Sequence, residues 1–126
     1  MLPKVLVVDD DADLREAIRE ELQDEGYTVR TAGDGRAALE ELRAHQDIDL
    51  ILVDLTMPSM GGRELIKALQ REGNTTPVVV VSGVSAPAAP GGGRLRRVTG
   101  AAGVLDKPFS LEALLDIVAR HTARPR

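Results

Sequence analysis

The chain has 126 residues, a one-domain length, and 43% of them are hydrophobic, so it can bury a sizeable core. It contains no cysteine, which excludes disulfides and thiolate metal sites and fits a cytoplasmic protein. The net charge of −4 disfavours non-specific nucleic-acid binding by this domain, and the first apolar run is too short for a signal peptide or a membrane span.

Short apolar runs alternate along the chain with segments in which apolar residues recur at helical spacing. Strands are predicted at residues 5–8, 27–32, 49–54, 78–81 and 104–106. A first helix is predicted over residues 14–22. Asp13 and Glu16 have the spacing of a capping box at its start, and Gly26 is placed to end it.

Three further helices are predicted from the same spacing. One follows the turn at residues 33–35 and another spans residues 64–72. The last is N-capped by Ser110. The inward positions of the second helix are Ala38, Leu39 and Leu42, and the apolar positions of the last are Leu111, Leu114, Leu115 and Val118.

This alternation predicts a parallel sheet with helices on both faces and right-handed crossovers. The pattern weakens at residues 85–93, where two prolines and three glycines disfavour a regular helix. Residues 94–99 can form at most about two helical turns. The fourth helix is therefore expected to be short or irregular.

Three aspartates lie at the carboxyl ends of predicted strands, Asp9 and Asp10 after the first and Asp54 at the end of the third. That edge of an open α/β sheet is where ligands bind. If the two strands are neighbours, the carboxylates converge and repel one another, and a hard cation such as Mg²⁺, or Mn²⁺ in its place, relieves the repulsion. The alternative is that the segment from Asp9 to Asp11 only caps a helix and solubilises a loop.

Two more polar residues end strands at the same edge, Ser82 after the fourth apolar run and Lys107 after the fifth. Acids for a metal, a hydroxyl donor and a fixed cation suit phosphoryl transfer, in which positioning and charge neutralisation do most of the work. Asp54 can then be the covalent acceptor, since a carboxylate can form an acyl phosphate.

Four motifs resemble the receiver domain of bacterial two-component response regulators. They read V-L-V-V-D-D, L-I-L-V-D-L-T-M-P-S-M-G-G, P-V-V-V-V-S-G and G-A-A-G-V-L-D-K-P-F, in family order, and the resemblance runs from about residue 4 to 121. It implies a flavodoxin-like (βα)5 fold with a five-stranded sheet in the order 2-1-3-4-5. It also implies one receiver domain over residues 1–126, in which 122–126 form a tail or the start of a linker.

The resemblance further implies a metal site and a phosphodonor. Asp54 would accept a phosphoryl group from a phosphohistidine on a sensor histidine kinase or a histidine phosphotransfer protein. Asp10, Asp54 and the main-chain carbonyl of Thr56 would ligate Mg²⁺, and Asp9 would act through a bound water.

Ser82 would hydrogen-bond the phosphoryl oxygen, Lys107 would pair with it, and the Lys107–Pro108 bond would be cis. The chain departs from the family where many receivers carry an aromatic residue three positions before the lysine. Val104 stands there, and its stiff side chain has no ring to swing with the hydroxyl of Ser82.

We expect a phosphoacceptor switch acting on an output protein that the sequence does not name, rather than an enzyme turning over an external substrate. A constitutive protein-binding module of the same fold is one alternative. A Mg²⁺-dependent phosphohydrolase is another, but enzymes of that type need a second acid two residues after the nucleophile, where Thr56 stands. A nucleotide- or flavin-binding protein is disfavoured by the acidic turn after the first strand, where a phosphate cradle needs glycines.

Overall fold

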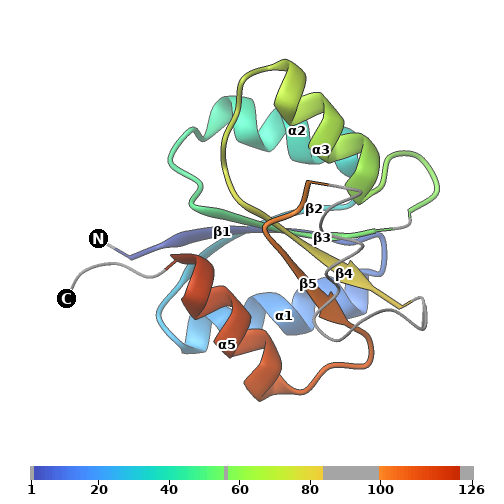
Figure 1. Cartoon of the computed structure of the whole chain (residues 1–126). Helices are drawn as coiled ribbons and strands as arrows, with labels where there is room; N and C mark the ends of the chain where they lie inside the picture. Colours follow the sequence, from blue (N-terminus) through green and yellow to red (C-terminus); the bar gives the residue numbers. More distant parts are fainter. Residues whose placement is uncertain (1, 56, 84–99, 123–126) are drawn as a thin grey trace.

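The computed structural model describes residues 2–55, 57–83 and 100–122. These residues form a parallel five-stranded sheet in the order β2-β1-β3-β4-β5 (Figure 1). The strands are β1 (Lys4–Val8), β2 (Thr28–Ala32), β3 (Leu50–Asp54), β4 (Val78–Ser82) and β5 (Gly103–Asp106). The helices are α1 (Ala12–Asp24), α2 (Gly35–Ala44), α3 (Gly62–Arg71) and α5 (Leu111–Thr122).

The predicted flavodoxin-like fold is confirmed, and every strand boundary lies within one residue of its predicted position. The expected short or irregular fourth helix falls on residues 84–99, which lie outside the described part of the chain. A membrane-crossing helix is absent from the described residues, since none of their helices is both long and apolar enough.

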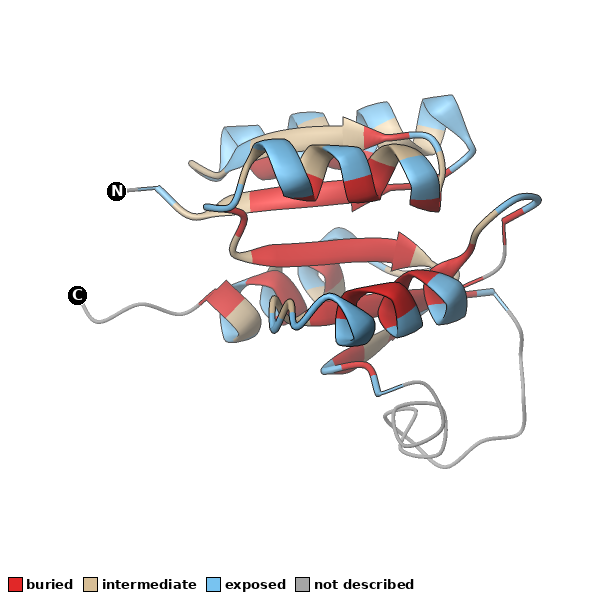
Figure 2. Ribbon diagram, turned by 90° about the horizontal axis from the view of Figure 1, so that it is seen from above, coloured by how far each residue is buried: buried red, intermediate tan, exposed pale blue. Residues whose placement is uncertain are grey.

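Helices cover both faces of the sheet, α2 and α3 on one side and α1 and α5 on the other (Figure 1). Figure 2 shows that the central strands are buried. Alternate residues of the central strand β3 pack on the two faces of the sheet. Ile51 and Val53 belong to the cluster beneath α2 and α3, and Leu50 and Leu52 to the cluster beneath α1 and α5. Because both faces are buried, the strands need the unbroken apolar runs by which the sequence predicted them.

The start of α1 differs from the predicted capping box of Asp13 and Glu16. Asp11 is the N-cap, and its Oδ1 accepts hydrogen bonds from the main-chain N–H groups of Asp13 (3.0 Å) and Leu14 (3.2 Å). Asp13 is already inside the first turn. The capping-box prediction was wrong because the helix begins two residues earlier, and Asp11 accepts the unpaired N–H groups of that earlier first turn. Gly26 does follow the helix, with φ of +98°.

Helix α3 begins at Gly62, two residues before the predicted start. Its N-cap is Gly61, which has no side chain to offer, and the carboxylate of Glu64 instead accepts the Gly61 N–H at 3.0 Å. Glu64, which was predicted to be the first residue of the helix, therefore caps its N-terminus.

The last helix is capped as predicted, since the Ser110 hydroxyl accepts the N–H of Ala113 at 3.0 Å. Its apolar face differs in part, because Leu111 is 46% exposed and Ile117 is buried. Thr122 is helical and buried, and its hydroxyl donates to the Val118 carbonyl at 2.7 Å. The packed structure therefore reaches residue 122 rather than 121.

Candidate functional site

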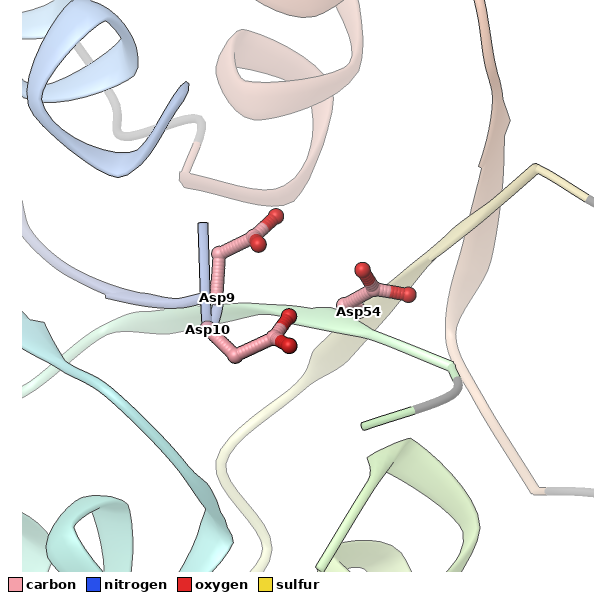
Figure 3. Close-up of side chains that lie close together, drawn as sticks. All are labelled: Asp9, Asp10 and Asp54. Carbon is pink, nitrogen blue, oxygen red and sulfur yellow. The ribbon is translucent and has the colours of Figure 1, made fainter. Parts of the chain in front are cut away.

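Three carboxylates meet at the carboxyl edge of the sheet. Asp9 and Asp10 follow β1, and Asp54 ends β3. The two strands are parallel neighbours with Val8 opposite Val53, so their carboxyl ends lie side by side. One carboxylate oxygen of each residue lies within 4.8 Å of the others, and Figure 3 shows the three side chains close together. The predicted juxtaposition of these acids is confirmed.

Asp9 is the buried member of the group, with 3% of its surface exposed. Its main-chain N–H donates to the Ala32 carbonyl at 3.1 Å, and its Oδ1 accepts the Asp11 N–H at 2.9 Å. Burial raises the pKa of the Asp9 carboxyl above its usual value. The hydrogen bond from Asp11 and the charge of Lys107 oppose that rise in pKa, and the charges of Asp54 and Asp10 add to it.

Lys107 follows β5 and reaches across β4 to the acids. Its Nζ lies 3.1 Å from Asp54 Oδ2 and 3.9 Å from Asp9 Oδ2. Burial by itself lowers the pKa of the ammonium, but the hydrogen bond to Asp54 and the charges of Asp54, Asp9 and Asp10 outweigh burial, so the pKa is raised. Lys107 therefore carries a positive charge against two of the three acids. The bond between Lys107 and Pro108 is cis, as expected.

Ser82 is the last residue of β4 and is buried. It lies opposite Asp106 of β5, and its carbonyl accepts the Lys107 N–H at 2.8 Å. Asp54 lies opposite Val81, one residue before Ser82, so Ser82 and Asp54 end neighbouring strands. Val104 is half-buried in β5. Thr56, the expected carbonyl ligand, lies outside the described residues.

The loop after Asp54 is folded back on the strand end. The Leu55 N–H donates to the Val81 carbonyl at 2.9 Å, and the Leu55 carbonyl accepts the Gly62 N–H at 3.1 Å. A Cβ on Gly61 would stand 2.4 Å from that same carbonyl oxygen. Only glycine allows this approach, which places the start of α3 against the main chain that follows Asp54.

One contact at the site was not anticipated from the sequence. Nη1 of Arg15, in the first turns of α1, donates to the main-chain carbonyl of Asp9 at 2.7 Å. A single arginine in an amphipathic helix usually reads as a solvated residue. The one feature of the sequence that could have pointed to this contact is that Arg15 is the sole basic residue in the acidic stretch D-D-D-A-D-L-R-E.

The donor set fits a small hard cation. The three carboxylates offer oxygen ligands, and Asp10 is exposed, which leaves room for water or phosphate oxygens. Three acids this close repel one another, and Lys107 compensates only part of their charge. A divalent ion bound among Asp9, Asp10 and Asp54 would remove the remaining imbalance.

Comparison with protein families and solved structures agrees with this geometry. The family model described as the response regulator receiver domain matches residues 5–119. The structure of the chemotaxis protein CheY4 of Vibrio cholerae is 36% identical, covers 96% of this chain and 99% of its own, and superposes with a TM-score of 0.84. The receiver domain of a Francisella response regulator is 30% identical, covers 98% of this chain and 99% of its own, and has a TM-score of 0.83.

Curated relatives are longer proteins. The response regulator MprA of Mycolicibacterium vanbaalenii is 38% identical over 112 residues, which are 89% of this chain and 47% of the relative. A probable transcriptional regulatory protein of Picosynechococcus is 36% identical over 118 residues, covering 89% of this chain and 46% of the relative. The chain thus spans about half the length of these relatives. With the family model covering most of its residues, the chain belongs to the response regulator receiver domain family of two-component systems.

Proposed function

We propose that the chain is a phosphoacceptor switch in which Asp54 takes a phosphoryl group from the phosphohistidine of a sensor histidine kinase or a histidine phosphotransfer protein. The observation that carries the proposal is the position of Asp54. It shares a site with Asp9 and Asp10 within 4.8 Å and pairs with Lys107 at 3.1 Å.

In the proposed reaction a carboxylate oxygen of Asp54 forms a bond to phosphorus while the bond from phosphorus to the donor imidazole nitrogen breaks. The electron pair of that bond stays on the imidazole, which takes up a proton from water. Asp54 is half-buried at the end of a central strand, so its oxygen approaches from a fixed direction.

Two side chains would hold the transferred group. Lys107, freed from its pair with Asp54, contacts a phosphoryl oxygen, and the Ser82 hydroxyl donates to another. Asp10, Asp54 and the Thr56 carbonyl would ligate Mg²⁺, with Asp9 acting through water; when bound, the ion neutralises charge on the phosphoryl oxygens. Mn²⁺ would serve in its place.

We further propose that the chain forms a single receiver domain ending with α5, because the family model covers residues 5–119 and one sheet unites the described strands. On the strength of that family we propose a cytoplasmic setting and an output protein whose contacts change with the charge of Asp54. External substrates are not turned over; the chemistry is phosphotransfer to Asp54 and loss of that group to water.

Intact-mass measurement tests the proposal. The protein is incubated with Mg²⁺ and acetyl phosphate, and the expected product is heavier by one phosphoryl group. The adduct should disappear with EDTA and in Asp54→Asn. Beryllofluoride should bind wild type under the same conditions, again only with Mg²⁺.

An adduct that persists in Asp54→Asn would contradict the proposed acceptor. No adduct with acetyl phosphate and no beryllofluoride binding would instead support the alternative, a receiver-like module that works through constitutive protein contacts. Rapid catalytic release of phosphate from unrelated phosphomonoesters would support a phosphohydrolase.

A further inference from the structure

The conformation of Asp10 is set from both sides of its own backbone. Asp10 is exposed, while its neighbour Asp9 is buried. The peptide unit after Asp10 ends in the Asp11 N–H, which donates to Asp9 Oδ1 at 2.9 Å. The peptide unit before Asp10 contains the Asp9 carbonyl, which accepts Arg15 Nη1 at 2.7 Å. Because peptide units are planar, holding these two units fixes φ and ψ of Asp10.

The Arg15 side chain is itself placed by the fold. Arg15 belongs to α1, and its side chain is half-buried. Its Nη1 lies 3.5 Å from the position that a Cβ on Gly33 would occupy. Gly33 follows β2, and the Asp9 N–H pairs with Ala32 at the end of that strand. The guanidinium thus lies between the turn after β1 and the turn after β2, where a rigid planar group can hold one carbonyl in place.

From these contacts we propose that Arg15 is a positioning residue for the cation site, in that its guanidinium holds the peptide between Asp9 and Asp10 and so aims the exposed Asp10 carboxylate at the space beside Asp54. The inference rests on the proposed function, since it concerns the same metal site. Arg15 touches neither the ion nor the phosphoryl group; it acts through Asp10.

A second role for Arg15 gives the opposite expectation, which makes the idea testable. If Arg15 mattered only as a nearby positive charge, it would repel a bound cation. Its removal would then tighten metal binding. If Arg15 positions Asp10, its removal weakens metal binding although the repulsion is also lost.

The experiment measures Mn²⁺ and Mg²⁺ binding by titration calorimetry at fixed ionic strength, using the whole chain. Arg15→Gln is expected to raise the dissociation constant about tenfold, the lower end of the loss found when groups that orient metal ligands are removed. Arg15→Lys keeps the charge but lacks the planar fork, so its dissociation constant should lie between those of wild type and Arg15→Gln.

Arg19→Gln is the matched control. It removes the same charge one turn further along α1, where Arg19 pairs with Glu16 and Gln23 and, among the described residues, makes no hydrogen bond or ion pair with the turn after β1. Its metal affinity should be no weaker than that of wild type. Phosphorylation by acetyl phosphate adds a second readout. Arg15→Gln should need more Mg²⁺ for half-maximal rate but reach the wild-type rate at saturation.

The outcomes separate the two proposals. Unchanged or tighter binding by Arg15→Gln would overturn the role of Arg15 and leave the proposed function intact. If Arg15→Gln does not fold by circular dichroism, Arg15→Lys decides, and affinity equal to wild type overturns the inference. Absence of any divalent-ion binding by wild type would overturn the proposed function and this inference together.

Discussion

At the scale of single residues, Asp9 is the acid of the site whose burial opposes its ionisation. Its carboxylate is buried, and burial is the largest reason that its pKa is raised above 3.8. Protonated Asp9 makes its full contribution to stability when the pH lies below the pKa of this carboxyl in the unfolded chain. That contribution is lost as the pH rises through the higher pKa of the same carboxyl in the folded chain. Above that folded pKa the ionised side chain therefore destabilises the metal-free fold.

Replacing Asp9 by asparagine should stabilise the metal-free protein at pH 7. The amide oxygen can still accept the Asp11 N–H, Lys107 keeps its nearer partner Asp54, and the buried charge is gone. We expect the melting temperature in EDTA to rise by about 4 °C, which corresponds to roughly 1 kcal/mol in a domain of this size. Calorimetry checks the shift.

Asp13→Asn, which removes an exposed acid from α1, is the control and should change stability by no more than about 0.5 kcal/mol. The advantage of Asp9→Asn over wild type should shrink as the pH falls toward 4, because Asp9 becomes protonated in wild type. A lower melting temperature than wild type at pH 7 would contradict the account of Asp9.

At the scale of elements, the connection from β3 to α3 is the tightest part of the site. Gly61 approaches the Leu55 carbonyl so closely that an added Cβ would stand 2.4 Å from the oxygen. The obstacle is main chain rather than a flexible side-chain tip, so a larger residue must move the loop or the helix. The same loop leads directly out of Asp54.

Gly61→Ala should therefore destabilise the fold by about 1–3 kcal/mol, the usual cost of overpacking. Chemical denaturation measures the loss. Gly33→Ala is the matched control, because its Cβ would meet only Arg15 Nη1 at an ordinary 3.5 Å. Equal stability of Gly61→Ala and wild type would show that the loop can retreat freely.

The elements that the sequence predicts well are those whose burial leaves a pattern. Strands covered on both faces need continuous apolar runs, so β1, β3 and β4 are evident from the sequence, and the acids follow from where those runs end. Helix starts are harder to predict, because Asp11 and Asp13 have similar capping chemistry and only the geometry of the turn selects Asp11. The contact of Arg15 with Asp9 leaves no periodic signal and needs coordinates.

At the scale of the whole molecule, the fold gathers like charges that it cannot compensate by itself. Three acids that follow or end two neighbouring strands meet within 4.8 Å. Among the described residues, Lys107 is the basic side chain that forms ion pairs with two of them, Asp9 and Asp54. Unfolding separates Asp54 from Asp9 and Asp10, so the unfolded chain has no such site. A divalent ion bound by the three acids, as proposed above, would therefore favour the folded form.

Mg²⁺ should accordingly raise the melting temperature of wild type at pH 7. A ligand bound only by the folded state adds about 2.7 kcal/mol of stability at a concentration 100 times its dissociation constant. Scanning calorimetry over a Mg²⁺ series measures the rise. Asp10→Asn and Asp54→Asn should lose most of the response, and an equal response to Na⁺ at matched ionic strength would show that the effect is mere screening.

Strand β3 lies in the middle of the sheet, hydrogen-bonded to β1 on one side and β4 on the other. Amides of a central strand exchange with solvent deuterium only through large openings of the sheet, whereas those of an edge strand such as β2 need smaller ones. Asp54 is thus attached to the part of the backbone that opens least readily. We therefore expect the loops around Asp54 to accommodate a change of charge on its side chain, while the strand that carries it stays in register.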